Sequence, residues 1–244
     1  MRARGGALLV VVALMAAGCG DEPKAPDPAQ VPVVATSEEV ADFVAAVAGR
    51  RAAVRIVLRP GDQRQAVLEA KAVFRAGGPG DAWVARLRPT LPRRPTVDLS
   101  RSVVLRERRG EVEQDWWRDP QNVRAALLRI RDSLVKVDPT SGGPYRTNAD
   151  RYSARVQALD KALARCLAPL AVPAARRPPE PGYFAGRYRL ARRPELPGRQ
   201  SGPNWLAAQA RLGDLAARML SGGRLRCTVA VPPAVLTPAV PPAP

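Results

Sequence analysis

Histidine is absent from this chain of 244 residues. Without an imidazole the chain cannot build a Ser-His-Asp or Cys-His catalytic arrangement, and it lacks the commonest metal ligand of proteins. The glycines of segment 77–80 are not followed by the Lys-Ser/Thr pair that a phosphate-binding loop requires. We therefore expect that this protein is not an enzyme.

Lysine and aromatic residues are also scarce, with four lysines and 5% aromatic residues. The net charge of +17 comes almost entirely from arginines, which are scattered through every segment. No basic stripe interleaved with aromatic residues and no recognisable nucleic-acid-reading motif accompanies them. The many alanines and prolines beside them are equally typical of a GC-rich genome. We therefore expect no nucleic-acid partner.

Long apolar runs are missing as well, with one exception near the N-terminus. Arg2 and Arg4 precede an apolar run from Ala7 to Ala17, which is shorter than the ~20 residues that span a bilayer. A charged start, a short apolar run and small residues are typical of a secretory signal peptide, here residues 1–18. The following Cys19 matches the lipidated cysteine of bacterial lipoproteins. We expect an exported periplasmic or cell-surface lipoprotein, anchored to the membrane through this cysteine; the alternative is an ordinary signal followed by an incidental cysteine.

The two other cysteines have two interpretations. Lipidation of Cys19 leaves Cys166 and Cys227, an even number in an oxidising compartment, so a disulfide between them is allowed. The same residues also suit two small buried hydrophobic positions. The sequence does not separate these alternatives.

Residues 19–33 are rich in proline, which is unfavourable for a helix and favours a tether. In residues 34–143 helical and strand patterns alternate, which favours βαβ units on a parallel sheet. A capping box of Thr36 and Glu39 starts the first helix, and Asp81 can cap another short helix. Strands are expected at 54–58, 72–74 and 103–105.

The middle of the chain has the strongest helical patterns. Asp119 and Pro120 are an N-cap followed by proline at the first helical position, and the helix ends at Asp138. A second helix, expected within residues 144–169, exceeds ~30 Å and can link two lobes. The remaining segments are a C-terminal α/β lobe at 170–232, with a helix starting near Trp205 and a buried strand at 225–231, and a proline-rich tail at 233–244.

Several motifs resemble one family. Residues 115–122, Asp-Trp-Trp-Arg-Asp-Pro-Gln-Asn, resemble the pattern His-x-Trp-x-Asp-Pro-x-Asn of the zinc/manganese solute-binding lipoproteins of ABC transporters. Segments 70–83, 183–190 (Tyr-Phe-Ala-Gly-Arg-Tyr-Arg-Leu) and 197–201 resemble further motifs of that family, in the same order. The resemblance implies an α/β fold of two lobes with parallel sheets flanked by helices, joined by one long rigid helix, with the second lobe shortened. It also implies a monomeric receptor that holds a zinc or manganese ion between its lobes and delivers it to an ABC permease.

The metal ligands of that family do not carry over to this chain, because they are mainly histidines. Asp115 replaces the histidine of the Trp motif, and Pro178 falls where another histidine is expected. Asp115, Asp62 and Glu180 can be imagined to converge on a hard cation such as manganese, magnesium or calcium. The positive field of the protein opposes this, and Asp115 can equally be a solvated or arginine-paired carboxylate.

Two functional hypotheses remain. One is the substrate-binding lipoprotein of a metal-type ABC transporter, with a degenerate or carboxylate-only site. The other is a membrane-tethered interaction lipoprotein that keeps the receptor fold but no longer binds metal, and whose arginine-rich surface meets anionic partners. In either case Trp116, Trp117 and Tyr183 can line a cleft between the lobes, although core packing is the more common use of such residues.

Overall fold

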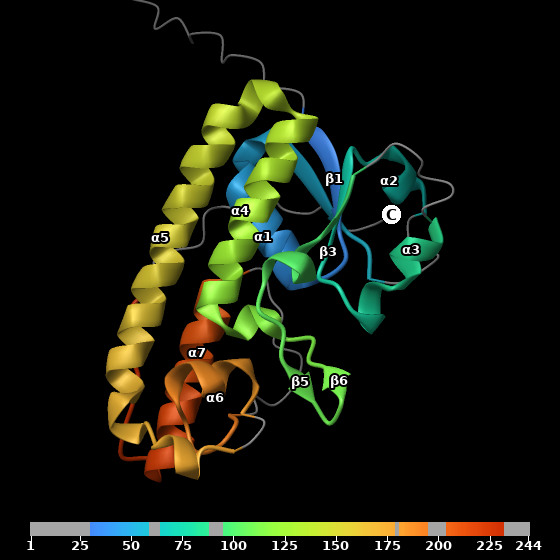
Figure 1. Ribbon diagram of the computed structural model, residues 1–244. Helices are drawn as coiled ribbons and strands as arrows, with labels where there is room; N and C mark the ends of the chain where they lie inside the picture. Colours follow the sequence, from blue (N-terminus) through green and yellow to red (C-terminus); the bar gives the residue numbers. More distant parts are fainter. Residues whose placement is uncertain (1–29, 59–63, 88–94, 179–180, 195–203, 232–244) are drawn as a thin grey trace, which may run out of the picture.

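The computed structural model describes residues 30–58, 64–87, 95–178, 181–194 and 204–231 (Figure 1). Cys19, the expected signal peptide, Asp62, Glu180 and the C-terminal tail lie outside these residues. Four parallel strands form the central sheet in the order β2-β1-β3-β4. Their bounds are β1 Val31–Ala35, β2 Ala52–Ile56, β3 Ala72–Arg75 and β4 Thr96–Asp98.

Helices cover both faces of this sheet (Figure 1). The helices α1, α4 and α5 lie on one side, and the short helices α2 and α3 lie on the other. Their bounds are α1 Glu38–Ala48, α2 Arg64–Glu69, α3 Trp83–Leu87, α4 Pro120–Val137 and α5 Gly142–Leu167. The short 3-10 helices are η1 Gly49–Arg51, η2 Pro79–Asp81, η4 Leu99–Ser102, η5 Trp116–Arg118, η6 Pro139–Ser141, η7 Ala168–Leu170 and η8 Ala174–Arg176.

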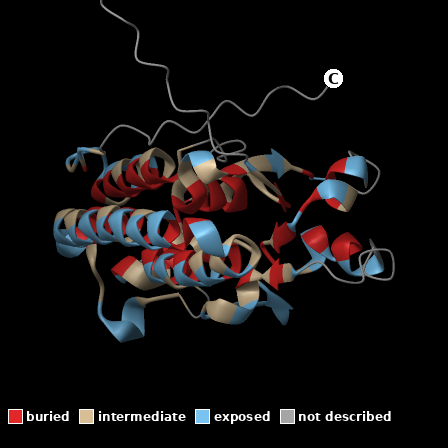
Figure 2. Cartoon of the chain, turned by 90° about the horizontal axis from the view of Figure 1, so that it is seen from above, coloured by how far each residue is buried: buried red, intermediate tan, exposed pale blue. Residues whose placement is uncertain are grey.

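The strand sequences explain the two layers of core. Successive side chains of a strand point to opposite faces, so Val33 and Phe74 enter the large core against α1, α4 and α5. Val34 and Val73 enter the smaller core that α2 and α3 close. Figure 2 shows the buried residues concentrated where the helices face the sheet and one another, with exposed residues on their outer sides. The expected α/β class, with a parallel sheet flanked by helices, is confirmed.

The long helix α5 is also confirmed, and its 26 residues extend about 39 Å. Its first half packs on α1 and α4, and its second half packs on α6 (Gly182–Tyr188) and α7 (Trp205–Ser221). One apolar stripe makes these contacts, as the spacing of its residues predicts. The buried members of this stripe are Tyr145, Tyr152, Val156, Leu159, Leu163 and Leu167.

The second parallel sheet is not found in the described part of residues 170–231, which is helical apart from one isolated bridge between Ala171 and Leu190. The buried strand expected at 225–231 is therefore wrong. The amide N–H groups of Leu225 and Cys227 donate to the side chains of Ser221 and Asp214, so they do not pair with another strand. Prolines between 173 and 181 also interrupt the segment that precedes α6, where a central strand tolerates them poorly.

Other local predictions need correction. The N-cap of α1 is Ser37, whose hydroxyl accepts from the Val40 amide, and not Thr36. The strand expected at 103–105 is absent, because the Val104 amide and carbonyl bond to the side chain of Asn122. A hairpin of β5 (Glu107–Arg108) and β6 (Glu111–Val112) follows instead.

The start of the sheet also differs from the expected domain plan. Strand β1 begins at Val31, so residues 31–33, which the proline pattern places in the tether, belong to the sheet. Among the described helices, none is both long and apolar enough to cross a bilayer.

Candidate functional site

The carboxyl ends of β1 and β3 meet at the point where the strand order reverses, the edge at which α/β sheets bind ligands. Asp81 is buried there and accepts hydrogen bonds from the Thr36 hydroxyl and the Gly77 amide, both at 2.9 Å. The Arg75 guanidinium lies 3.5 Å from the same carboxylate. Asp81 therefore ties the two strand ends together and is not the helix cap that the sequence suggests.

Asp115, the residue that replaces the histidine of the Trp motif, lies beside this edge at the N-cap position of η5. Its carboxylate is 3.0 Å from the Arg118 guanidinium and 3.6 Å from that of Arg193. Arg193 also contacts the carboxylate of Glu113, whose side chain is only 7% exposed. Asp115 is thus the arginine-paired carboxylate of the two sequence interpretations, and the guanidinium of Arg193 lies between two acidic groups.

This ion-pair cluster connects the two halves of the chain. Glu113 and Asp115 precede α4, whereas Arg193 follows α6. A neighbouring contact supports the same junction, because the Tyr183 hydroxyl donates to the Glu113 carbonyl and accepts from the Arg106 amide. Burial raises the pKa of Tyr183, so its hydroxyl stays protonated and able to donate.

The aromatic residues of the motif pack in the core. Trp116 is 1% exposed, its indole N–H donates to the Ala76 carbonyl at 2.9 Å, and its ring contacts Phe43. Tyr183 is equally buried. Trp117 packs edge-on against Trp116 and is partly buried. Of the two uses considered for these side chains, the structure has core packing.

The expected three-residue metal site remains a prediction. Asp62 and Glu180 lie outside the described residues, and Asp115 is engaged by two arginines. Within the part of the chain that the structure describes, no group of three or more Cys, Asp or Glu side chains is arranged to hold a metal ion.

Two carboxylates that the sequence does not single out, the buried Asp160 and the partly buried Asp42, join helices together. Asp160 on α5 accepts from the Arg187 Nε and the Tyr188 hydroxyl of α6, both at 3.1 Å. Asp42 on α1 accepts from the Tyr152 hydroxyl of α5 at 3.1 Å and from the Trp205 amide at the start of α7 at 3.0 Å. Burial raises the pKa of Asp42 to about 6. Each of these aspartates has a helical position that looks solvated in sequence, so no local pattern identifies them.

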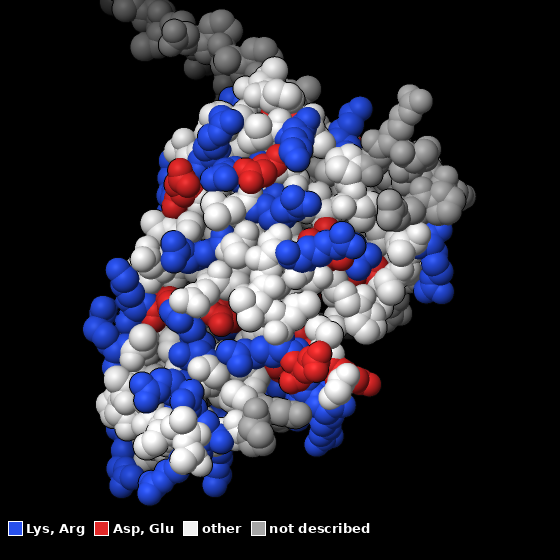
Figure 3. All heavy atoms as spheres, in the orientation of Figure 1, with Lys and Arg blue, Asp and Glu red and all other residues white. Residues whose placement is uncertain are grey.

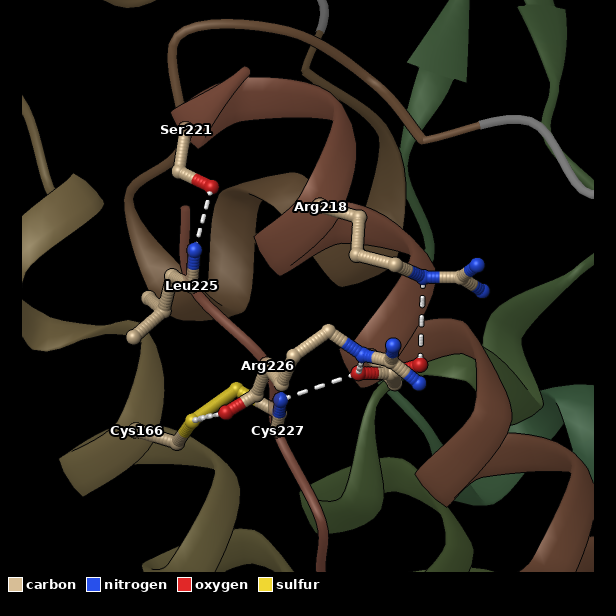
Figure 4. Close-up of a disulfide and its surroundings, with 7 residues drawn as sticks. Cys166, Arg218, Ser221, Leu225, Arg226 and Cys227 are labelled. Atoms are coloured by element: carbon tan, nitrogen blue, oxygen red, sulfur yellow. Dashed lines mark hydrogen bonds and ion pairs between the residues drawn. A yellow bond between two sulfur atoms is a disulfide. The ribbon is translucent and has the colours of Figure 1, made fainter. Parts of the chain in front are cut away.

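Cys166 and Cys227 form a disulfide, with Cα atoms 5.8 Å apart (Figure 4). The bridge fastens the extended segment after α7 to the last turn of α5. The sequence allows either a disulfide or two separate buried cysteines, and the structure has the disulfide.

Comparisons with known proteins give the family. The family model described as ZnuA, zinc-uptake complex component A, periplasmic, matches residues 33–211. The manganese-binding lipoprotein MntA of Halalkalibacterium halodurans is 29% identical over 170 residues, which are 63% of this chain and 56% of MntA. The chain thus spans little more than half the length of that curated relative.

Solved structures share the fold. A zinc-bound deletion mutant of ZnuA has a TM-score of 0.58 and 22% identity, covering 68% of this chain and 69% of that one. The Zn(II)-bound ZnuA-like domain of Streptococcus pneumoniae AdcA has a TM-score of 0.56 and 24% identity, covering 68% and 66%. The metal-dependent lipoprotein YcdH of Bacillus subtilis has a TM-score of 0.57 and 19% identity, covering 78% and 75%. With the family model matching most of its length, this chain belongs to the ZnuA family of zinc/manganese solute-binding proteins.

Proposed function

We propose that this chain is an exported lipoprotein that keeps the fold of the metal receptors but no longer binds zinc or manganese at Asp115, and that serves as a membrane-tethered interaction module. The observation that supports this most is the position of Arg193. Its guanidinium pairs with both Glu113 and Asp115, at the place where the family motif has a metal-binding histidine.

Exchanging the arginine for a metal ion at this place lowers the stability of the folded chain. A divalent cation that binds Asp115 has to displace or repel Arg118 and Arg193. The guanidinium groups of both arginines lie within 4 Å of the Asp115 carboxylate. The Glu113 side chain is buried, and removing the cation that pairs with a buried carboxylate lowers the free energy of unfolding by about 3–5 kcal/mol. The network therefore favours the guanidinium over an ion from solution.

A second function has support from the family itself. MntA is a manganese-binding lipoprotein and the ZnuA-like domain of AdcA binds Zn(II), which favours a substrate-binding lipoprotein of a metal-type ABC transporter with a carboxylate-only site and an ABC permease as partner. In that case Asp115 would ligate the ion together with Asp62 and Glu180.

Calorimetric titration separates the two proposals. The mature chain with Cys19→Ser, which removes the lipid anchor, is titrated with zinc, manganese and calcium. We expect no heat of binding and no thermal stabilisation with any of the three. Binding that is lost in Asp115→Asn and retained in the distant variant Asp214→Asn would refute the first proposal and support the carboxylate-only receptor.

The anchor and the partner need their own measurements. Mass spectrometry of the protein extracted from membranes tests for a diacylglyceryl group on Cys19. Copurification of the lipidated protein with an ABC permease tests the transport role.

A further inference from the structure

The excess of positive over negative charge is concentrated at one end of the described part of the molecule. The described residues from 161 to 231 contain twelve arginines and lysines and a single carboxylate, Asp214. In the described residues from 30 to 160, by contrast, acidic side chains are nearly as numerous as basic ones. In Figure 3, the end formed by the last turns of α5 with α6 and α7 carries the blue spheres of Lys and Arg among white ones.

Six exposed arginines form this surface, which we call the basic end. They come from four different elements: the last turn of α5, η8, the residue after α6, and the last turn of α7 with the segment that follows it. Contacts between these elements bring the arginines together, since Cys166 is bonded to Cys227 and the Val172 amide donates to the Arg189 carbonyl. The basic end consists of Arg165, Arg176, Arg189, Arg218, Arg224 and Arg226.

The arginines after α7 are held in place. Asp214 accepts from the Cys227 amide at 3.0 Å, and its carboxylate also pairs with Arg218 at 3.2 Å and Arg226 at 3.1 Å. The Arg224 Nε donates to the Ser221 carbonyl at the end of α7. Figure 4 shows Arg218, Arg226 and Cys227 in this arrangement, beside the disulfide. The segment is therefore ordered before any partner arrives, which lowers the entropy lost on binding.

The charge of the basic end is not neutralised within the described part of the chain. Asp214 is shared between two arginines whose side chains are 46% and 65% exposed. The negative ends of the dipoles of α5 and α7 lie here as well and stabilise nearby cations. Two helix termini, each equivalent to about half a charge, offset only a small part of six guanidinium groups.

We propose that the basic end is a membrane-contact surface that binds the phosphate groups of anionic phospholipids. Guanidinium groups form paired hydrogen bonds with phosphate oxygens, and arginines spread over one end of a protein fit an extended anionic surface. The inference rests on the membrane-tethered role proposed above and specifies the partner.

The proposed anchor can reach this arrangement. Strand β1 begins at Val31, twelve residues after Cys19, and twelve residues can span up to about 40 Å. This maximal span equals the length of α5, roughly 39 Å, at whose last turn the basic end lies. A chain anchored through Cys19 can therefore place its basic end on the lipid headgroups.

Vesicle cosedimentation tests the proposal. The mature chain with Cys19→Ser is mixed at 100 mM salt with vesicles of phosphatidylcholine alone, or of phosphatidylcholine with 30% phosphatidylglycerol. We expect binding only to the anionic vesicles and its loss at 500 mM salt. Since each cation near the surface contributes about fivefold, replacing Arg165, Arg176 and Arg224 by glutamine should lower the partition coefficient on the order of 100-fold. These three leave the Asp214 ion pairs intact.

A matched variant separates this site from the net charge. Arg129, Arg146 and Arg151 are exposed residues of α4 and the first half of α5, and their replacement by glutamine makes the same charge change away from the basic end. We expect it to lower binding less than tenfold. Equal losses in the two triple variants, no binding to anionic vesicles, or binding to soluble polyglutamate without binding to vesicles would each overturn the proposal. A heat of metal binding in the calorimetric titration would refute the proposed loss of metal binding and leave the vesicle result unaffected.

Discussion

The disulfide between Cys166 and Cys227 gives the most quantitative prediction. The two residues are 61 positions apart, so the bridge closes a long loop that includes α6 and α7. In the chain-entropy treatment, closing a loop of this length lowers the entropy of the unfolded state and stabilises the folded state by about 4 kcal/mol at 25 °C. We expect the variant Cys166→Ser with Cys227→Ser to lose about that amount.

Thermal unfolding followed by circular dichroism measures this loss. For a protein of this size 1 kcal/mol corresponds to about 2–4 °C, so the variant should melt about 8–16 °C below the oxidised protein. Reduction of the natural protein with dithiothreitol should produce a similar shift.

The serine variant is also the control, because dithiothreitol should not change its melting temperature. A shift below 2 °C in both the variant and the reduced protein would refute the reasoning. It would mean that the bridge does not restrict the unfolded chain beyond what contacts between α5 and α7 already do.

Three further predictions follow from individual side chains. Arg193→Met leaves the buried Glu113 without its cation and should cost about 3–5 kcal/mol at neutral pH in urea denaturation; a loss below 1 kcal/mol would contradict the pairing. Because burial raises the pKa of Asp42 from 3.8 to about 6, the folded state binds more protons than the unfolded state between these values, and stability should fall by about 2 kcal/mol as pH rises from 4 to 6. Asp42→Asn should remove this contribution, which urea denaturation at pH 4 and pH 7 will detect. Asp119→Ala removes the N-cap of α4 and should cost about 1 kcal/mol, with faster amide exchange in the first turn.

Local patterns are sufficient for the long helices α4 and α5. Asp119 caps α4 as the sequence predicts, and proline stands at its first position. The spacing of apolar residues identifies α5 over nearly its whole length. These signals are reliable because a cap and an amphipathic stripe depend on residues within one or two turns of each other.

Strands were harder to identify. β1 contains Pro32, and a proline beside a proline-rich tether favours irregular chain. The structure accommodates it near the start of the strand, where the Pro32 carbonyl accepts from the Lys71 amide. The opposite error occurs at 225–231, where an apolar sequence has no strand beside it among the residues that the structure describes.

The candidate site could be predicted only at one residue. The position of Asp115 follows from the Trp motif, but its partner Arg193 is 78 residues later in the chain. No periodicity connects residues at such a separation, and Arg193 is one of many arginines in its region. Long-range ion pairs therefore become visible only when the fold places their elements together.

Arg193 has one property that an ion captured from solution does not have. A dissolved cation leaves when its concentration falls, whereas this guanidinium is covalently part of the polypeptide and is present at a constant local concentration. The junction between the hairpin region and the residues after α6 is consequently occupied under all supply conditions. Any protein that recognises the surface around this junction therefore meets the same shape at low and at high metal concentration.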